Sequence, residues 1–310
     1  MANIKSDISE ATKVSNSENK TKDGPLLIIN DYVFKRIFSI KNILASFLTA
    51  YLCFEIKESE IEIENPLNGP LKKNDKINLP DLKVTIKINS DVLGKFDIEM
   101  QTTCHEFIWE KFQYALCKEY VDQLSRGRDY SELNRAFVLV IYSVNAIKDE
   151  ACYHRLKLYD TENNFEYPRS NEIHILEIPK RDQLLLNKSQ EDKEKFKLLF
   201  KWLQFFASKT EEEYMQAAQG NAAMEAAYDR IKVMSMDKDE RAIADAVEIA
   251  IGNEIAQFKS GLKQGREEMA NEKDTAYVTN MLKKNMSTDE IIELSGLTEK
   301  RINENKATLQ

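Results

Sequence analysis

Glycine, proline, cysteine and histidine are all scarce in this chain. Nine glycines and six prolines among 310 residues, with 31% charged residues, favour a helix-rich globular protein over a β-sandwich or barrel. The four cysteines include no Cys-x-x-Cys pair and there are only three histidines, which excludes a typical zinc site and a disulfide framework. Reduced thiols of this kind are typical of the cytoplasm.

Long apolar runs are missing as well. No stretch approaches the roughly 18 apolar residues that a membrane-spanning helix needs. Residues 1–24 are polar and mixed in charge, without the apolar centre of a signal peptide. We therefore expect a cytoplasmic protein with no membrane partner and a disordered tail over 1–24.

An excess of positive charge is also lacking. The net charge is −8, which excludes a uniformly basic nucleic-acid binder but leaves local contacts with nucleic acid open. Any contact with DNA therefore has to come from an uneven placement of lysine and arginine.

The order of the predicted elements indicates the fold class. Helical spacing over 31–51 and 106–124 alternates with strands at 82–101, 136–142, 152–159 and 172–178. This order is typical of an α/β protein with a mixed sheet flanked by helices and, from residue 190, a helical C-terminal extension. Four regions are expected: a tail over 1–24, a core domain over 25–207, a helical extension over 208–270 and short helices over 271–310.

Residues 82–101 predict a β-hairpin that turns between Asn89 and Gly94. Because successive side chains on a strand point to opposite faces, Asp97, Glu99 and Gln101 share one face of the second strand. A polar row of this kind is more than solubility requires. It is the arrangement that a divalent metal ion would use.

Hydrolysis of a phosphodiester needs its charge neutralised and a water molecule activated. Carboxylates that hold Mg²⁺ or Mn²⁺ serve both needs. Asp81, Glu99 and Gln101 fit as two metal ligands and a third group that orients water or phosphate, with Asp97 as a spare carboxylate. Asp31, at a helix start, could approach the same site from outside the sheet.

Simpler interpretations of the same residues remain open. Asp31 suits an N-cap or first-turn position of its helix, and Gln101 could be an ordinary solvated strand residue. Trp109 and Trp202 fit core or rim positions. The histidines lack a common spacing and are not expected to be ligands.

Several separated blocks strengthen the metal-site interpretation. They are Asp31-Tyr-Val-Phe-Lys-Arg-Ile-Phe, Phe47-Leu-Thr-Ala-Tyr-Leu, Pro80-Asp81, Ile98-Glu-Met-Gln101, Gln123-Leu-Ser-Arg-Gly-Arg-Asp-Tyr130 and Ile175-Leu-Glu-Ile-Pro-Lys180. In order and spacing, over roughly 27–205, they resemble the recombination-promoting nuclease and putative transposase family of the PD-(D/E)xK superfamily. The resemblance implies a restriction-endonuclease-like core and Mg²⁺-dependent DNA cleavage.

The resemblance also implies a role for individual residues. Asp81 and Glu99 match the acidic metal ligands, Asp31 matches the acid at the start of the first helix, and Gln101 stands where the wider superfamily has lysine. Where the family commonly has arginine in the following helix, this chain has Lys111, which keeps the charge but loses the bidentate fork. We expect phosphate contacts from Lys111 and from the two arginines of the Arg126-Gly-Arg128 turn, although all three also suit a solvated helix end.

Residues 287–302 resemble a helix-turn-helix, but their glutamates make a packing or self-association tail an equal alternative. The leading hypothesis is a Mg²⁺-dependent DNA endonuclease that self-associates through its helical C-terminus. The alternative is a catalytically degenerate nuclease fold that binds DNA or protein.

Overall fold

The computed structural model describes most of the chain, namely residues 24–64, 82–89, 91–104, 107–125, 127 and 129–307. Three predicted site residues, Asp81, Arg126 and Arg128, lie outside the described residues. By their internal contacts the residues fall into two compact units, one ending at Val247 and the other beginning at Glu248.

The helices and strands follow the predicted order. The strands are β1 (Ile61–Ile63), β2 (Leu82–Ile88), β3 (Asp91–Gln101), β4 (Ala136–Tyr142), β5 (Tyr153–Leu156), β6 (Tyr159–Asp160), β7 (Phe165–Glu166) and β8 (Glu172–Glu177). The helices are α2 (Asp31–Phe38), α3 (Lys41–Leu52), α4 (Ile108–Val121), α5 (Gln190–Ala207), α6 (Glu211–Ala218), α7 (Ala222–Met236), α8 (Lys238–Lys283), α9 (Thr288–Ser295) and α10 (Glu299–Ala307).

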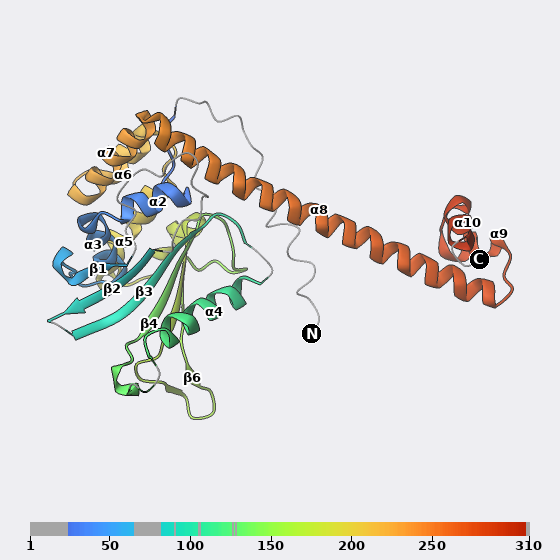
Figure 1. Cartoon of the computed structure of the whole chain (residues 1–310), viewed down its shortest axis with the longest axis horizontal. Coiled ribbons are helices and arrows are strands. Elements are labelled where there is room, and N and C mark those ends of the chain that lie inside the picture. Colours follow the sequence, from blue (N-terminus) through green and yellow to red (C-terminus); the bar gives the residue numbers. More distant parts are fainter. Residues whose placement is uncertain are drawn as a thin grey trace. The chain divides into compact units, whose positions relative to one another are not determined.

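Six strands form one mixed sheet in the order β1-β2-β3-β4-β8-β5 (Figure 1). The central strands β3, β4 and β8 are parallel, and the outer strands join them antiparallel. β4 is buried along its whole length, as its continuous apolar sequence predicts for a central strand covered on both faces. The predicted α/β class with a mixed sheet is therefore confirmed.

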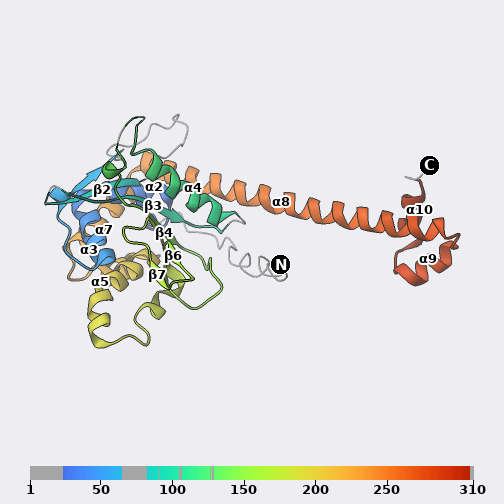
Figure 2. The same ribbon diagram turned by 90° about the horizontal axis from the view of Figure 1, so that it is seen from below.

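Helices cover both faces of this sheet (Figures 1 and 2). On one face α4 packs through Ile108 and Phe112 against Val140 of β4 and Ile175 of β8. On the other face Tyr51 of α3 meets the ring of His174 edge-on, and α5 packs beside α3. Successive side chains along β3, β4 and β8 therefore point alternately toward α4 and toward α3 and α5.

An aromatic cluster joins the helices behind the sheet. The ring centroids of Phe38 of α2, Phe47 of α3, and Trp202 and Phe206 of α5 lie between 5.3 and 5.9 Å apart in all six pairs. Trp202 is fully buried, which confirms its predicted core position, whereas Trp109 on α4 is half-exposed at the rim. These aromatic pairs fix how α2, α3 and α5 pack together.

A buried carboxylate ties α7 and the start of α8 to α2. Glu240 accepts hydrogen bonds from the Tyr32 hydroxyl at 2.6 Å, from Arg36 at 2.7 Å and from Arg230 at 3.1 Å. Residues 208–247 are accordingly part of the same compact unit as the sheet. The boundary predicted after residue 207 therefore lies within this unit. Whether the four predicted regions fold separately stays a prediction.

The predicted hairpin turn is confirmed at Asn89 but is shorter than predicted. The hairpin turns at Asn89, which has a positive φ of 51°, so that Gly94 lies within β3. α4 ends at Val121 with Asp122 as its C-cap. Gly94 has a different reason to be glycine, because a Cβ there would lie 2.4 Å from the ring of Phe137.

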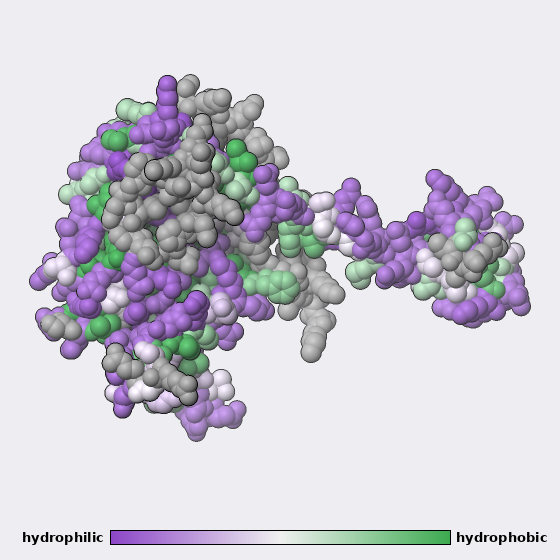
Figure 3. All heavy atoms as spheres, viewed as in Figure 1, coloured by the Kyte–Doolittle hydropathy of each residue, from purple (hydrophilic) through white to green (hydrophobic). Residues whose placement is uncertain are grey.

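The second unit holds the end of α8 together with α9 and α10. Val278, Ile291 and Ile302 form its small core, one residue from each helix. Ser287 and Glu290 form a capping box at the start of α9. Hydrophilic side chains predominate on the face shown in Figure 3, and no helix among the described residues is long and apolar enough to cross a membrane.

Candidate active site at the end of strand β3

The polar row predicted on β3 lies under α4 instead of facing solvent. Asp97 and Glu99 are both buried, and Gln101 is half-buried. The row shares a face with Val138 and Val140 of β4 through the parallel register, which is the face that α4 covers. A carboxylate buried this deeply requires partners, because an unpaired charge is costly away from water.

Glu99 finds its partners on two different elements. Its Oε2 accepts a hydrogen bond from Gln101 Nε2 at 2.6 Å and forms an ion pair with Lys111 Nζ at 2.5 Å. The carboxylate acceptor requires the amide NH₂ of Gln101 to point toward Glu99. Oε1 of Glu99 accepts no hydrogen bond from any residue that the structure describes.

Lys111 reaches this carboxylate from α4. Phe112, the next residue along the helix, is anchored in the apolar layer over β4 and β8, so Lys111 comes from the rim of the helix. About half of its side chain is exposed, against a tenth for Glu99. The ammonium group therefore joins a buried carboxylate to the solvent-facing surface, where a phosphate could approach it.

Asp31 occupies the first turn of α2, as predicted for its acidic side chain. The N-cap itself is Asn30, whose side-chain oxygen accepts from the backbone of Tyr32 and Val33. Asp31 pairs with Lys35 at 3.0 Å, one turn further along the helix. α2 also contacts β3. The predicted metal-binding role of Asp31 stays a prediction.

Tyr142, at the end of β4, is a polar group that sequence reasoning did not assign to the site. It is buried, and its hydroxyl has no hydrogen-bond partner among the described residues. Burial raises the pKa of Tyr142 well above its usual value, and Cys104 and Glu99 raise it further. It lies beside Gln101 in the parallel register, so only the pairing of β3 with β4 reveals its place.

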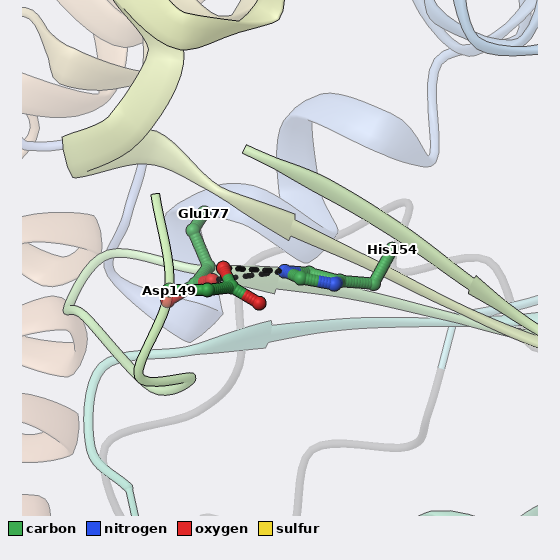
Figure 4. A group of neighbouring side chains, drawn as sticks. All are labelled: Asp149, His154 and Glu177. Atoms are coloured by element: carbon green, nitrogen blue, oxygen red, sulfur yellow. Dashed lines mark ion pairs between the residues drawn. The ribbon is translucent and has the colours of Figure 1, made fainter. Parts of the chain in front are cut away.

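A second polar cluster lies around the end of β8. His154 Nε2 is 3.4 Å from Asp149 Oδ1 and 3.5 Å from Glu177 Oε2, and the three side chains converge as Figure 4 shows. Their candidate ligand atoms lie within 4.8 Å of one another, close enough to hold a metal ion. The sequence offered no signal for this group, because its members come from a loop and two strands.

The contacts of Glu177 indicate that this cluster organises the loop after β4. Glu177 Oε1 accepts from the backbone N–H groups of Ala146 and Ile147, and Oε2 accepts from Lys180 at 2.8 Å. Lys180 also lies 3.5 Å from Asp149. The ammonium group of Lys180 thus already balances the negative charge of this cluster. The prediction that the histidines are not metal ligands stays a prediction.

Comparison with known proteins identifies the chain at the level of its family. A family model described as PD-(D/E)XK nuclease family transposase matches residues 28–253. The chain belongs to this family. The match is longer than the resemblance over 27–205 and takes in α6, α7 and the start of α8. No curated protein and no solved structure matches the chain.

Membership gives the carboxylate site its context. The six-stranded mixed sheet with flanking helices agrees with a nuclease of this family, and such nucleases generally use divalent metal ions. The donor set around Glu99 fits a hard cation, since carboxylate and amide oxygens are the ligands that Mg²⁺ and Mn²⁺ prefer. In this part of the site, Glu99 Oε1 and the amide oxygen of Gln101 are oxygens of this kind.

Proposed function

We propose that this chain hydrolyses phosphodiester bonds in DNA as an endonuclease that depends on Mg²⁺ or Mn²⁺. The observation that carries the proposal is the meeting of Glu99, Gln101 and Lys111 at the end of β3, in a chain of the nuclease family. Asp81 and Glu99 would hold the metal, with Asp31 as a further acid at the same site. Arg126 and Arg128 are proposed to contact the DNA backbone.

The residues of the site divide the chemical tasks. The metal, when bound, neutralises phosphate charge and lowers the pKa of a bound water molecule. Gln101 has no charge and serves by hydrogen bonding, holding Glu99 in place through its NH₂ group. Lys111 supplies the positive charge that Gln101 lacks, and its exposed stem lets the ammonium group turn from Glu99 toward a phosphate.

Cleavage of supercoiled plasmid in the presence of Mg²⁺ tests this proposal. Glu99→Gln and Asp81→Asn should each lower the nicking rate by about 100-fold or more, since each removes a ligand charge. Glu62→Gln is the matched control, because Glu62 is an exposed carboxylate on β1 of the same sheet and pairs with Lys87. Nicking that survives both site substitutions at the wild-type rate would refute the assignment.

One observation favours a second candidate function, a nuclease fold that binds DNA or protein without cutting. Lys111 already neutralises Glu99 in the structure, as a metal ion would. Binding of Mn²⁺ measured by electron paramagnetic resonance separates the two candidates. Binding in the wild type that Glu99→Gln abolishes supports the nuclease, whereas DNA binding without any Mn²⁺ binding supports the second candidate.

A further inference from the structure

A regular apolar repeat runs along α8 within the second unit. The residues are Ile251, Ile255, Phe258, Leu262 and Met269, with Gly265 at the remaining position of the repeat. Their spacing alternates between four and three residues, which is the a and d pattern of a coiled coil. We call this row the α8 stripe.

The α8 stripe is solvent-accessible. Phe258 is 39% exposed, Leu262 is 36% exposed and Met269 is 70% exposed. The opposite side of the helix carries polar residues at the corresponding positions of successive heptads, namely Asn253, Ser260 and Glu267. A helix with this division of residues is stabilised when its apolar side packs against another helix.

Charged residues flank the stripe with a different sign on each side. Glu254 and Glu268 occupy the g positions on one flank. Lys259, Arg266 and Lys273 occupy the e positions on the other flank. In a coiled coil these flanking positions decide which helices pair and in which direction, through salt bridges between helices.

This charge pattern complements a parallel copy of itself. In a parallel pair each g residue meets the e residue five positions further along the other helix. Glu254 would then face Lys259 of the partner subunit, and Glu268 would face Lys273 of the partner subunit. In an antiparallel pair g faces g and e faces e, which would bring like charges together.

We propose that two copies of this chain associate through a parallel, in-register coiled coil of α8 whose apolar layers span residues 251–269. The coil is about 27 Å long at 1.5 Å per residue. It places each apolar layer opposite its own copy and pairs every g glutamate with a lysine. Gly265 leaves one layer without a side chain, so the association is weaker than the rest of the repeat would allow.

The association connects the second unit with the proposed function, because it brings two candidate sites into one complex. Each chain carries one candidate site around Glu99, and cutting both strands of a duplex in a single binding event uses two such sites. A dimer supplies two. This consequence rests on the proposed nuclease function, but the association itself does not.

Sedimentation equilibrium of the full chain over a range of concentrations tests the dimer. The wild type should show a monomer–dimer equilibrium, and Leu262→Asp should lower the association constant by about 100-fold, because it buries a charge in the seam. Ile249→Asp is the matched control, since Ile249 is 63% exposed on the same helix but lies outside the stripe. A monomeric wild type, a trimer, or a Leu262→Asp dimer of unchanged stability would overturn the proposal.

Two variants test the layer and the charges separately. Gly265→Leu should raise the association constant by about tenfold or more, because a Cβ at Gly265 meets no atom within 4 Å and a leucine would fill the empty layer.

Glu254→Lys should weaken association, and adding Lys259→Glu should restore it. Failure of this restoration would refute the pairing of g with e.

The direction of pairing is tested by a disulfide. Under mild oxidation, Gly265→Cys should form a cross-link between residue 265 of one chain and the same residue of the other, identified by mass spectrometry of the digested protein. Absence of this cross-link from a dimeric variant would overturn the parallel arrangement. None of these readouts needs nuclease activity, so loss of the proposed function and loss of the proposed dimer are distinguishable.

Discussion

The carboxylate of Glu99 shows how one residue can acquire a partner that its own strand does not provide. The strand neighbour Gln101 is neutral, and the positive charge comes from Lys111 on α4. Because the pair is partly buried, its attraction is screened less than that of a surface ion pair. We expect Lys111 to compete with a cation for Glu99 and also to stabilise phosphate charge during reaction.

Lys111→Met separates these two effects. The nicking rate should fall by about 10²–10³, since an electrostatic contact to the reacting phosphate is lost. Mn²⁺ affinity should stay equal or rise, because the competing ammonium group is gone. Lys111→Arg should keep more of the rate than Lys111→Met. Lys118→Met is the control, since Lys118 lies on the same helix and pairs with Asp122.

Equal loss of Mn²⁺ binding and of activity in Lys111→Met would contradict this division of roles. It would show that Lys111 mainly holds Glu99 in place. The same measurement on Lys118→Met should show no change in either quantity.

At the scale of elements, the site depends on how closely β3 passes β4. Gly94 of β3 lies against the ring of Phe137, which is stacked on Phe96 at a centroid distance of 4.4 Å and covered by Arg135. The ring therefore has little freedom to move aside. This close approach keeps the parallel register that brings Gln101 beside Tyr142.

Gly94→Ala should lower the free energy of unfolding by about 1–3 kcal/mol, because the added methyl group overpacks the ring of Phe137. Gly252→Ala is the matched control on a helix, where the added Cβ meets nothing within 4 Å. That substitution should instead stabilise by about 1 kcal/mol through helix propensity. Urea denaturation followed by circular dichroism measures both, and a neutral Gly94→Ala would show that the ring relaxes freely.

The hydrogen bonds of Glu240 connect three helices, α2, α7 and α8. Glu240→Ala leaves Arg36 and Tyr32 without their shared acceptor and should destabilise the first unit by about 3–5 kcal/mol. Asp239→Ala, an exposed neighbour in the same first turn, should cost about 1 kcal/mol or less. Equal midpoints for the two variants in thermal unfolding would contradict the structural role of Glu240.

At the scale of the whole molecule, a buried acid on β8 makes stability depend on pH. Glu172 is buried, and burial alone would raise its pKa, but hydrogen bonds from Arg155 and His174 and their charges lower it to about 2. His174 donates through Nε2 to Glu172 and accepts through Nδ1 from Tyr153. Burial lowers the pKa of His174 below 6.5, so its neutral form is favoured in the folded protein.

Both shifts make the folded protein less stable in acid. The unfolded chain binds more protons than the folded one below pH 6.5 at His174 and, more strongly, between about pH 4.5 and pH 2 at Glu172. The free energy of unfolding should therefore be highest above pH 6.5 and fall as the pH decreases, with about 3 kcal/mol lost through Glu172. Urea midpoints across this range measure the profile.

Glu172→Gln should flatten the lower part of this profile, although its stability at neutral pH is also reduced. The exposed Glu162→Gln serves as the control and should leave the shape unchanged. A Glu172→Gln profile as steep as that of the wild type below pH 4.5 would assign the acid sensitivity to other groups.

The sequence by itself determined the local features of this protein. Alternation and helical spacing follow from the geometry of a single strand or helix, so the hairpin, the buried run of β4 and the capping box at Ser287 were predictable. The order of its motif blocks was enough to predict the family, which the family model then confirmed. The role of Gly94 was not predictable, because it depends on contacts with Phe137 on another strand.

Only the tertiary structure decided the surroundings of the site. The sequence placed Glu99 and Gln101 on one face but could not show that α4 buries this face, nor that Lys111 pairs with Glu99. The place of Tyr142 depends on the pairing of β3 with β4, and the Asp149–His154–Glu177 cluster depends on the pairing of β5 with β8. The physical reason is that burial and charge pairing are set by residues far apart in the chain, whereas sequence periodicity reports only neighbours along a single element.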